Sequence, residues 1–238
     1  MVDVRRLLAP LVEAPAETAI LLDVDGTLAP IVGQPELARV PDDTRAELRR
    51  LVGSYPLVAC VSGRTSVDAR RVVGVDGPVY VGVHGLELAP EAEPWRGPLR
   101  EFAASVAWPV EDKGVAVVFH YRGAEDEDAA VAELRGVAAR ATALGLDARF
   151  GRKVLEVRPP VRADKGTAVR SLVDQHRLRR ALYAGDDTTD LDAFRGLEQL
   201  QTAVRIAVTS EEGPDELHAA ADLVVGGPAE LLELLRLL

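Results

Sequence analysis

The chain has 238 residues, of which 47% are hydrophobic and 28% charged, and its 28 Lys and Arg residues against 38 Asp and Glu residues give a formal net charge of −10. This composition is typical of a globular protein and argues against a disordered chain, and the acidic balance with only 4% aromatic residues argues against a nucleic-acid-binding protein. The single Cys60 excludes a disulfide framework, and no run reaches the ~18–20 uncharged apolar residues of a membrane helix, so we expect a cytoplasmic protein with neither a nucleic-acid nor a membrane partner.

The first part of the chain alternates short apolar runs with helical patterns. Residues 1–17 predict a short helical arm. Strands that are buried on both faces of a parallel sheet are expected at residues 18–22, 57–61 and 79–83. Between these strands we expect one helix that begins near Pro41 and stops at Gly53, and a second helix over residues 67–73.

The pattern changes in the middle of the chain. Residues 91–97 are rich in Pro and acidic residues and predict a connector. Residues 115–121 predict a strand whose odd positions share a face, which puts His120 and Arg122 together on the other face. Further elements are expected at residues 125–144 (a helix), 146–150 and 154–157 (two strands). Together these elements predict a small α+β unit.

Strands and helices then alternate again, with elements expected at residues 165–173, 181–184, 190–197, 206–208, 223–225 and 230–238. The predicted fold class is therefore α/β. We expect a core domain with a parallel sheet at residues 18–97 and 159–238, and an inserted α+β cap domain at residues 98–158.

Three of the predicted strands end at small, polar or acidic residues, namely Asp23-Val24-Asp25-Gly26-Thr27, Ser62-Gly63-Arg64 and Gly185-Asp186-Asp187-Thr188-Thr189-Asp190. Because the carboxyl ends of parallel strands meet at one edge of a sheet, where ligands bind, we expect these groups to converge. Lys165 opens a predicted helix, whose free backbone N–H groups also suit an anion. Taken singly, the first segment also fits an ordinary turn, and Asp164-Lys165-Gly166 also fits a helix cap followed by a solvated lysine.

Convergence would bring four carboxylates, those of Asp23, Asp25, Asp186 and Asp190, beside Lys165. Such a cluster repels itself and requires a cation, and an all-oxygen ligand set suits Mg²⁺. A carboxylate can attack phosphorus once the phosphate charge is screened, which gives an aspartyl-phosphate. A second carboxylate two residues further on can protonate the leaving alcohol and later activate water.

The four motifs of the haloacid dehalogenase superfamily of phosphohydrolases are matched in order by Asp23–Thr27, Ser62, Lys165 and Gly185–Asp190. Within that superfamily the chain resembles the trehalose-6-phosphate phosphatases in the segments DVDGTLAPIV at 23–32, VSGR at 61–64, HGLE at 84–87, EDKG at 111–114, HYR at 120–122, KVLEVRP at 153–159, DKG at 164–166 and GDDTTDLDAF at 185–194. The resemblance implies a Rossmannoid core with a cap domain, Mg²⁺ as the cofactor and trehalose 6-phosphate as the substrate. Because the chain has no synthase domain, the resemblance also implies a separate trehalose-phosphate synthase as a partner.

The same resemblance implies roles for the core residues. Asp23 resembles the nucleophile and a metal ligand, Asp25 the general acid/base with its carbonyl on the metal, and Asp186 the other protein ligand. Asp187 and Asp190 are expected behind the direct ligands, where Asp190 would orient a metal-bound water. The residues expected to hold the phosphate are Thr27, Ser62, Gly63 and the catalytic Lys165.

The substrate-binding residues that the resemblance implies are Arg64 and, on the cap, Glu111, Lys113, His120, Arg122, Lys153 and Glu156. Acidic and basic side chains suit the hydroxyl groups of a disaccharide, and a site built on such hydrogen bonds rejects analogues that lack a hydroxyl. His120 and Arg122 also fit the solvent side of a strand, and Glu156 also fits an ion pair with Arg158. The alternative functions are a phosphatase for another sugar phosphate, such as sucrose phosphate, a sugar phosphomutase, and a binding module without turnover.

Overall fold

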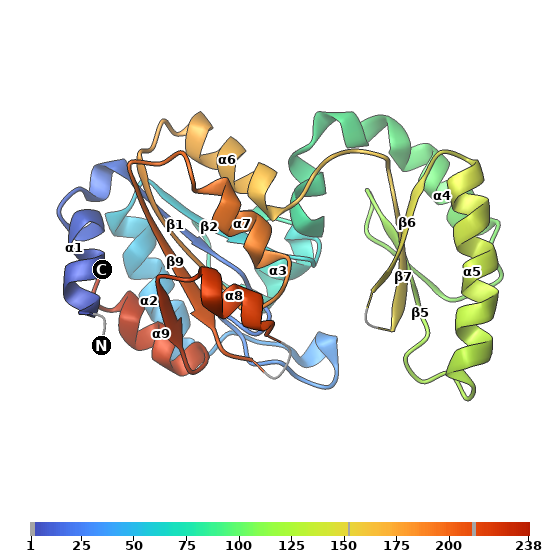
Figure 1. The fold of residues 1–238 in the computed structure, drawn as a ribbon, viewed down its shortest axis with the longest axis horizontal. Helices are drawn as coiled ribbons and strands as arrows, with labels where there is room; N and C mark the ends of the chain where they lie inside the picture. The colour runs from blue at the N-terminus through green and yellow to red at the C-terminus, as the bar shows by residue number, and fades with distance from the viewer. Residues whose placement is uncertain (1–2, 152, 211–212) are drawn as a thin grey trace. The chain divides into compact units, whose positions relative to one another are not determined.

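The structure, a computed structural model, describes residues 3–151, 153–210 and 213–238, so the first two residues of the predicted arm lie outside the described residues. The chain forms two compact units (Figure 1). Unit 1 comprises residues 1–85 and 163–238, and unit 2 comprises residues 86–162. These boundaries differ from the predicted ones at 97/98 and 158/159. Residues 86–97 group with unit 2 because they lead directly into a helix of its hydrophobic core.

Unit 1 is built on a six-stranded parallel sheet. Its strands are β1 (Thr18–Leu22), β2 (Leu57–Val61), β3 (Val79–Val81), β8 (Arg180–Gly185), β9 (Thr202–Val208) and β10 (Leu223–Val225). Its helices are α1 (Val4–Val12), α2 (Asp42–Ser54), α3 (Ser66–Val73), α6 (Lys165–Gln175), α7 (Asp190–Gly196), α8 (Asp215–Ala220) and α9 (Pro228–Leu235). The strand order is β10-β9-β8-β1-β2-β3, so the direction of winding reverses between β1 and β8. Ligands of open α/β sheets bind at such a reversal, outside the carboxyl ends of the strands.

Helices cover both faces of this sheet (Figure 1). On one face, residues such as Ile20 and Cys60 cluster with side chains of α1, α2, α3 and α9, and burial raises the pKa of the Cys60 thiol to about 12. The alternate residues, such as Leu21, are equally buried, and on that face α6 contacts β2 and α7 contacts β8. The central strands β1 and β2 are almost entirely apolar because both of their faces are covered. The helix α1, predicted as a separate arm, belongs to this layered core through Leu8 and Leu11.

Unit 2 is a four-stranded antiparallel sheet with two helices on one face. Its elements are α4 (Arg96–Ala104), β4 (Val110–Asp112), β5 (Val117–His120), α5 (Glu127–Ala143), β6 (Asp147–Gly151) and β7 (Val154–Arg158), in the strand order β4-β5-β7-β6. Val117 and Phe119 of β5 pack with Phe102 of α4 and Leu134 of α5, and the rings of Phe102 and Phe119 meet edge to face with centroids 6.4 Å apart. The fold class predicted from the sequence, an α/β core with an α+β insertion, is confirmed.

Several predicted elements need correction. Helix α2 runs through Gly53, the expected stop, and ends one residue later. The strand expected over 79–83 ends at Val81 because Val83 and His84 have φ values of 50° and 52°, which an extended strand does not allow. The expected connector over 91–97 lies mostly in a 3₁₀ helix, Pro90–Trp95, which continues into α4.

Other predicted elements are confirmed, among them the strands at 57–61 and 223–225 with the same bounds. No helix in the described ranges 3–151, 153–210 and 213–238 is both long and apolar enough to cross a membrane.

Candidate functional site

The acidic residues that follow β1 and β8 meet at the carboxyl edge of the unit 1 sheet. In the strand register, Leu22 pairs with Cys60 of β2 and with Ala184 of β8, and these two strands end one residue later, so the three strands reach the same edge of the sheet. The backbone N–H of Asp23 donates to the carbonyl of Ala184 at 2.9 Å, which extends the ladder by one residue. Asp23 and Asp186 therefore lie on either side of the point where the winding of the sheet reverses.

Lys165 binds two of the acidic residues at this edge of the sheet. It is the first residue of α6, whose start is fixed by Asp164 as the N-cap, with the Asp164 carboxylate accepting from the backbone N–H of Thr167 at 2.7 Å. The Lys165 ammonium lies 2.7 Å from Oδ1 of Asp23 and 2.7 Å from Oδ1 of Asp190. The Lys165 side chain is 3% exposed, so both ion pairs are buried. One buried cation thus joins acids that are far apart in the sequence.

Two glycines let the acids approach the backbone closely. Gly26 has a φ of +82°, and a Cβ atom there would overlap the carboxylate of Asp186. A Cβ atom on Gly185 would overlap the carboxylate of Asp190. Any side chain at these positions would push an acid out of the cluster, because carbon and carboxylate atoms cannot share that space.

Burial dominates the electrostatics of the cluster. Burial raises the pKa of Asp23 well above its ordinary value, and although Lys165 opposes this, the charges of Asp190 and Asp186 raise the pKa further. Burial and then the charge of Asp190 raise the pKa of Asp186 to about 6. Burial alone would lower the pKa of Lys165, but Asp190 and Asp23 reverse this and raise it, so Lys165 is held as a cation.

Asp23, Asp186 and Asp190 form a cluster that fits a divalent cation. One oxygen from each of the three buried carboxylates lies within 4.8 Å of the other two. Three carboxylates against the single ammonium of Lys165 leave an excess of negative charge, which a buried site does not tolerate without a counter-ion. The donor atoms are all oxygens, as Mg²⁺ prefers. Among the three, Asp190 already accepts four hydrogen bonds, which leaves Asp23 and Asp186 as the carboxylates with capacity for a metal.

Asp25 lies outside this cluster and is held by Arg64. Nε and Nη2 of Arg64 donate to Oδ2 and Oδ1 of Asp25 at 2.6 and 2.7 Å, and Nη1 donates to Asp68 at 2.6 Å. Arg64, predicted to contact substrate, therefore contacts two carboxylates of its own unit. These hydrogen bonds outweigh the burial of the guanidinium and raise the pKa of Arg64, so the arginine stays charged.

The residues predicted to hold phosphate lie along the same edge. Thr27 is buried and donates from Oγ1 to Asp186 at 3.3 Å. Ser62 is buried directly after β2, and its hydroxyl oxygen accepts from the backbone N–H of Arg64 at 3.2 Å. A Cβ atom on Gly63 would lie 2.7 Å from the His84 ring, so a larger residue there would displace this ring. Asp187 is exposed, and its carboxylate accepts from the backbone N–H of Thr188 at 2.6 Å.

The predicted sugar-binding residues of unit 2 lie on or beside one face of its sheet. Glu111 and Glu156 both lie opposite Val118 in the strand register, and His120 lies two residues further along β5, so these three share the face opposite to the hydrophobic cluster. Nε2 of His120 lies 2.8 Å from Oε2 of Glu111. Arg158, the alternative partner of Glu156, approaches Asp147, with its Nε 3.9 Å from Oδ2.

The other three residues of this predicted group lie in turns. Lys153 precedes β7 with a φ of 61° and pairs with Glu127 of α5. Lys113 lies between β4 and β5, and Arg122 follows the end of β5. The expectation that Arg122 shares a strand face with His120 is therefore wrong, because the strand ends at His120.

Sequence reasoning missed the side chain of Tyr183, and it missed the pairing of Arg64 with Asp25. Tyr183 of β8 donates from its hydroxyl to Oδ1 of Asp190 at 2.6 Å, and Arg64 holds Asp25. A signal for Tyr183 exists in the sequence, because a phenol in a fully buried apolar run needs a hydrogen-bond partner, and the next polar residues are the acids. The pairing of Arg64 with Asp25 has no comparable signal.

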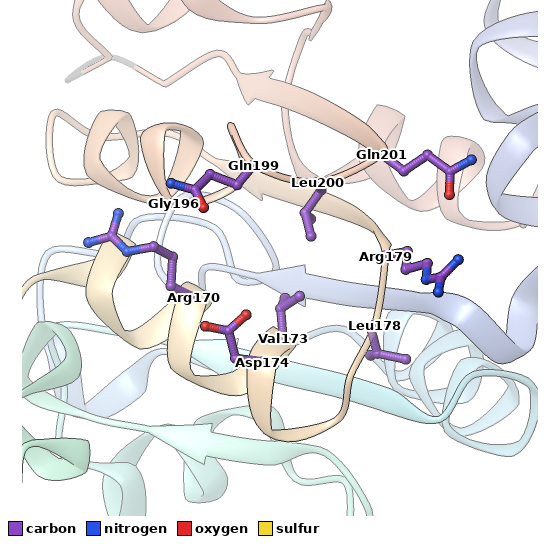
Figure 2. A pocket seen from close by; sticks show the side chains of 9 residues that line it. All are labelled: Arg170, Val173, Asp174, Leu178, Arg179, Gly196, Gln199, Leu200 and Gln201. Carbon is purple, nitrogen blue, oxygen red and sulfur yellow. The ribbon is translucent and has the colours of Figure 1, made fainter.

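A separate hollow of about 440 Å³ lies at the amino ends of β8 and β9, at the opposite edge of the sheet (Figure 2). Its lining residues come from α6, from the segment before β8 and from the segment between α7 and β9. It contains none of the predicted site residues.

The sequence matches the profile of the trehalose-phosphatase family over residues 21–108 and 99–225. It is 34% identical to a trehalose-phosphate phosphatase of Mycobacterium marinum, covering 90% of this chain and 60% of the relative. It is 30% identical to a probable trehalose-phosphate phosphatase of Oryza sativa subsp. japonica, covering 91% and 64%. It is 37% identical to an uncharacterised glycosyl hydrolase of Mycobacterium tuberculosis, covering 85% of this chain and 17% of that protein. The chain thus spans less than two thirds of the length of these curated relatives.

Solved structures share the fold. The C-terminal domain of the Candida albicans trehalose-6-phosphate phosphatase matches with a TM-score of 0.71 at 22% identity, covering 99% of this chain and 96% of that one. A haloacid dehalogenase-like hydrolase from Bacteroides thetaiotaomicron matches with a TM-score of 0.62 at 15% identity, covering 93% and 98%. The fold is therefore that of the haloacid dehalogenase-like hydrolases. Because the family profile matches nearly the whole of both units, the chain belongs to the trehalose-phosphatase family.

Proposed function

We propose that this protein is a Mg²⁺-dependent phosphatase that hydrolyses trehalose 6-phosphate to trehalose and phosphate through an aspartyl-phosphate on Asp23. The observation that carries the proposal is the buried contact of Lys165 with Asp23 and Asp190, at 2.7 Å each, beside Asp186. These residues follow different elements of the sheet, and a buried acid cluster of this kind costs stability unless it serves a charged ligand. Membership of the family supports the choice of substrate.

The phosphate group binds at the carboxyl edge of the sheet. The Lys165 ammonium and the Ser62 hydroxyl donate to phosphate oxygens, and the Thr27 hydroxyl does so after turning from Asp186. Gly63 leaves room for the phosphate near the backbone. Mg²⁺ would be held by the carboxylates of Asp23 and Asp186 and by the backbone carbonyl of Asp25, and when bound it supplies positive charge that neutralises the phosphate. Asp187 and Asp190 lie outside the direct ligands of the metal, and Asp190 holds the Lys165 ammonium in place.

Asp23 carries out the chemical step. One of its carboxylate oxygens attacks phosphorus, the bond from phosphorus to the sugar oxygen breaks, and the phosphoryl group is transferred to Asp23. The leaving oxygen takes a proton from Asp25. Water then attacks the phosphorus of the aspartyl-phosphate, Asp25 accepts a proton from that water, and inorganic phosphate leaves with Asp23 restored.

Asp25 must take up a proton and turn away from Arg64 before it can act as the acid. In the structure both of its oxygens accept hydrogen bonds from Arg64, an arrangement that suits an ionised carboxylate. Rotation of Asp25 away from Arg64 would free one oxygen for the sugar oxygen. Arg64 therefore acts on the acid/base as well as on any substrate group it contacts.

Unit 2 supplies the sugar contacts. Glu111, His120 and Glu156 share one polar sheet face, and Lys113 and Arg122 lie in the segments that follow its strands β4 and β5, so this part of unit 2 offers both donors and acceptors to hydroxyl groups. Lys153 would join them by leaving its ion pair with Glu127. Two further points stay predictions. One is a separate trehalose-phosphate synthase that supplies the substrate, and the other is a cytoplasmic location. A single, fully buried cysteine is consistent with a reducing compartment.

Release of inorganic phosphate tests the proposal. The purified chain is given trehalose 6-phosphate, sucrose phosphate, glucose 6-phosphate and an aryl phosphate, each with Mg²⁺ and with a chelator. We expect turnover that favours trehalose 6-phosphate, needs Mg²⁺ and is lost in Asp23→Asn. Asp25→Asn should slow both formation and breakdown of the phosphoenzyme, because one group serves both steps.

The other functions make different predictions in the same assay. Preference for sucrose phosphate would identify a different sugar phosphatase, and return of the phosphate to a sugar hydroxyl would identify a mutase. If none of the compounds released phosphate, the remaining alternative would be a binding module without turnover, and the proposal would be contradicted. Full activity of Asp23→Asn would contradict the aspartyl-phosphate mechanism.

A further inference from the structure

Tyr183 is a buried phenol directly beneath the acid cluster. It lies in the central strand β8, is 0% exposed, and its ring meets that of Phe194 edge to face with centroids 6.1 Å apart. Its hydroxyl donates to Oδ1 of Asp190 at 2.6 Å. The phenol oxygen thus reaches the site from inside the protein, on the side away from solvent.

Asp190 is held by four donors. Its Oδ1 accepts from Lys165 and from Tyr183, and its Oδ2 accepts from the backbone N–H groups of Asp186 and Asp187, each at 2.9 Å. Two carboxylate oxygens offer about four acceptor positions, so the acceptor capacity of Asp190 is filled. Of the four donors, the two backbone groups orient Oδ2, and Tyr183 is the only fixed group that orients Oδ1, because the other donor is the flexible lysine.

The direction of the Lys165 ammonium depends on Oδ1 of Asp190. An ammonium has three N–H groups, and two of them are directed to Asp23 and Asp190. Fixing two acceptors fixes the direction of the third N–H. A lysine side chain is a flexible chain of four carbons, so without fixed acceptors its ammonium samples other positions.

We propose that Tyr183 is a positioning residue for phosphoryl transfer, whose hydroxyl fixes Oδ1 of Asp190 and thereby directs the third N–H of Lys165 at the phosphate. The proposal rests on the proposed function, since it assumes that Lys165 binds phosphate. Tyr183 itself touches neither the phosphate nor the reacting atoms. Its effect passes through Asp190 to Lys165.

Tyr183→Phe tests this inference because it keeps the ring and its contact with Phe194 and removes only the hydroxyl. We expect kcat for trehalose 6-phosphate to fall about 10-fold, the size expected for one hydrogen bond to a charged group, and the affinity for inorganic phosphate in Mg²⁺ to fall in the same direction. The Mg²⁺ concentration for half-maximal activity should change less than the phosphate affinity, since Tyr183 contacts Asp190 and neither Asp23 nor Asp186, the carboxylates proposed to hold the metal.

Tyr80→Phe is the matched control. Tyr80 lies in β3 of the same unit, and its hydroxyl donates to the carbonyl of Val75 at 2.6 Å, so this change also removes one internal hydrogen bond from a tyrosine. We expect a similar fall in melting temperature in both variants and a loss of phosphate affinity in Tyr183→Phe alone. Phosphate affinity is measured well below the melting temperatures of both variants, where the unfolded fraction is too small to change it, and this separates positioning from a structural role.

Wild-type phosphate affinity and wild-type kcat in Tyr183→Phe would overturn the inference, as would an equal loss of phosphate affinity in Tyr80→Phe. If the wild-type protein released no phosphate from any sugar phosphate, the proposed function would fail. The affinity for inorganic phosphate in Mg²⁺, measured by calorimetry in the wild type and in Tyr183→Phe, would still decide the role of Tyr183.

Discussion

Asp186→Asn should abolish activity and at the same time stabilise the metal-free protein. The change removes one negative charge from the cluster of Asp23, Asp186 and Asp190 and keeps an oxygen that can accept from Thr27. In the wild type the ionised carboxylate is retained against an unfavourable environment, since burial and the charge of Asp190 both oppose ionisation. Replacing it by a neutral group of the same shape removes that cost.

The size of the effect follows from the pKa of Asp186. Folding raises this pKa from 3.8 to about 6. At about 1.4 kcal/mol for each pH unit, the ionised side chain destabilises the folded state by about 3 kcal/mol. A carboxyl whose pKa is raised holds its proton more tightly when folded, so the cost is complete above the folded pKa and absent below the unfolded one. The gain from Asp186→Asn should therefore be about 3 kcal/mol at pH 8 and close to zero at pH 3.5.

Urea unfolding in a chelator provides the assay, with a probe confined to unit 1. Both tryptophans, Trp95 and Trp108, lie in unit 2, so their fluorescence reports the wrong unit. Cys60 is the single cysteine and is fully buried in unit 1, so its reaction with a dithiodipyridine reagent, which also proceeds in acid, reports unfolding of the right unit. Asp76→Asn is the control, since that carboxylate is 97% exposed and pairs only with Arg70 at 3.7 Å.

Addition of Mg²⁺ should remove most of this difference in stability. The wild type gains about 2.7 kcal/mol when the free ion is at a hundred times its dissociation constant, and the variant, which lacks one ligand, gains less. The reasoning is refuted if Asp186→Asn is no more stable than the wild type at pH 8 in chelator, or if its advantage is the same at pH 8 and pH 3.5. A gain of the same size in Asp76→Asn would attribute the effect to net charge rather than to the cluster.

Two further predictions concern packing and specificity. Gly166→Ala should lower the unfolding free energy of unit 1 by several kcal/mol in the same thiol assay, because its Cβ would overlap the carbonyl oxygen of Asp192 and separate α6 from α7. The control Gly136→Ala, in open space on α5, should leave the stability of unit 1 unchanged. Equal stability of unit 1 in the two variants would contradict the close packing of α6 and α7. Glu156→Ala should lower kcat/KM for trehalose 6-phosphate at least about 10-fold more than for an aryl phosphate, as expected for the loss of hydrogen bonds to a substrate hydroxyl. The control Glu133→Ala, on the exposed side of α5, should change kcat/KM for neither substrate. Equal losses on both substrates in Glu156→Ala would mean that this sheet face does not select the sugar.

The sequence predicts the layered core well because burial on both faces leaves a clear record. Strands β1 and β2 are continuous apolar runs that end at acidic or small residues, and their common edge follows from parallel pairing alone. The approach of Asp23 to Asp186 is therefore predictable, and the structure brings them together. The roles of these residues stay predictions.

Other features depend on geometry that local patterns do not record. The connector expected over residues 91–97 overlaps the start of α4, since Pro94 favours a loop, yet Pro98 is well tolerated in the first turn of a helix, where its missing N–H is not needed. The early end of β3 follows from the backbone angles of Val83 and His84, which no apolar pattern indicates. Arg64 joins Asp25 across 39 residues, a pairing that only the folded chain determines.

The insertion of unit 2 also sets the order in which the sheet can be completed during synthesis. Strand β1 pairs with β2, which follows soon after it, and with β8, which begins roughly 160 residues after β1 ends. At about 5–20 residues per second, one edge of a fully apolar strand waits roughly 8–30 s on the ribosome for its neighbour. An exposed apolar edge invites pairing with other chains. Nascent copies of this protein are thus more vulnerable to aggregation than the finished molecule, and its yield in a cell depends on what shields that edge in the interval.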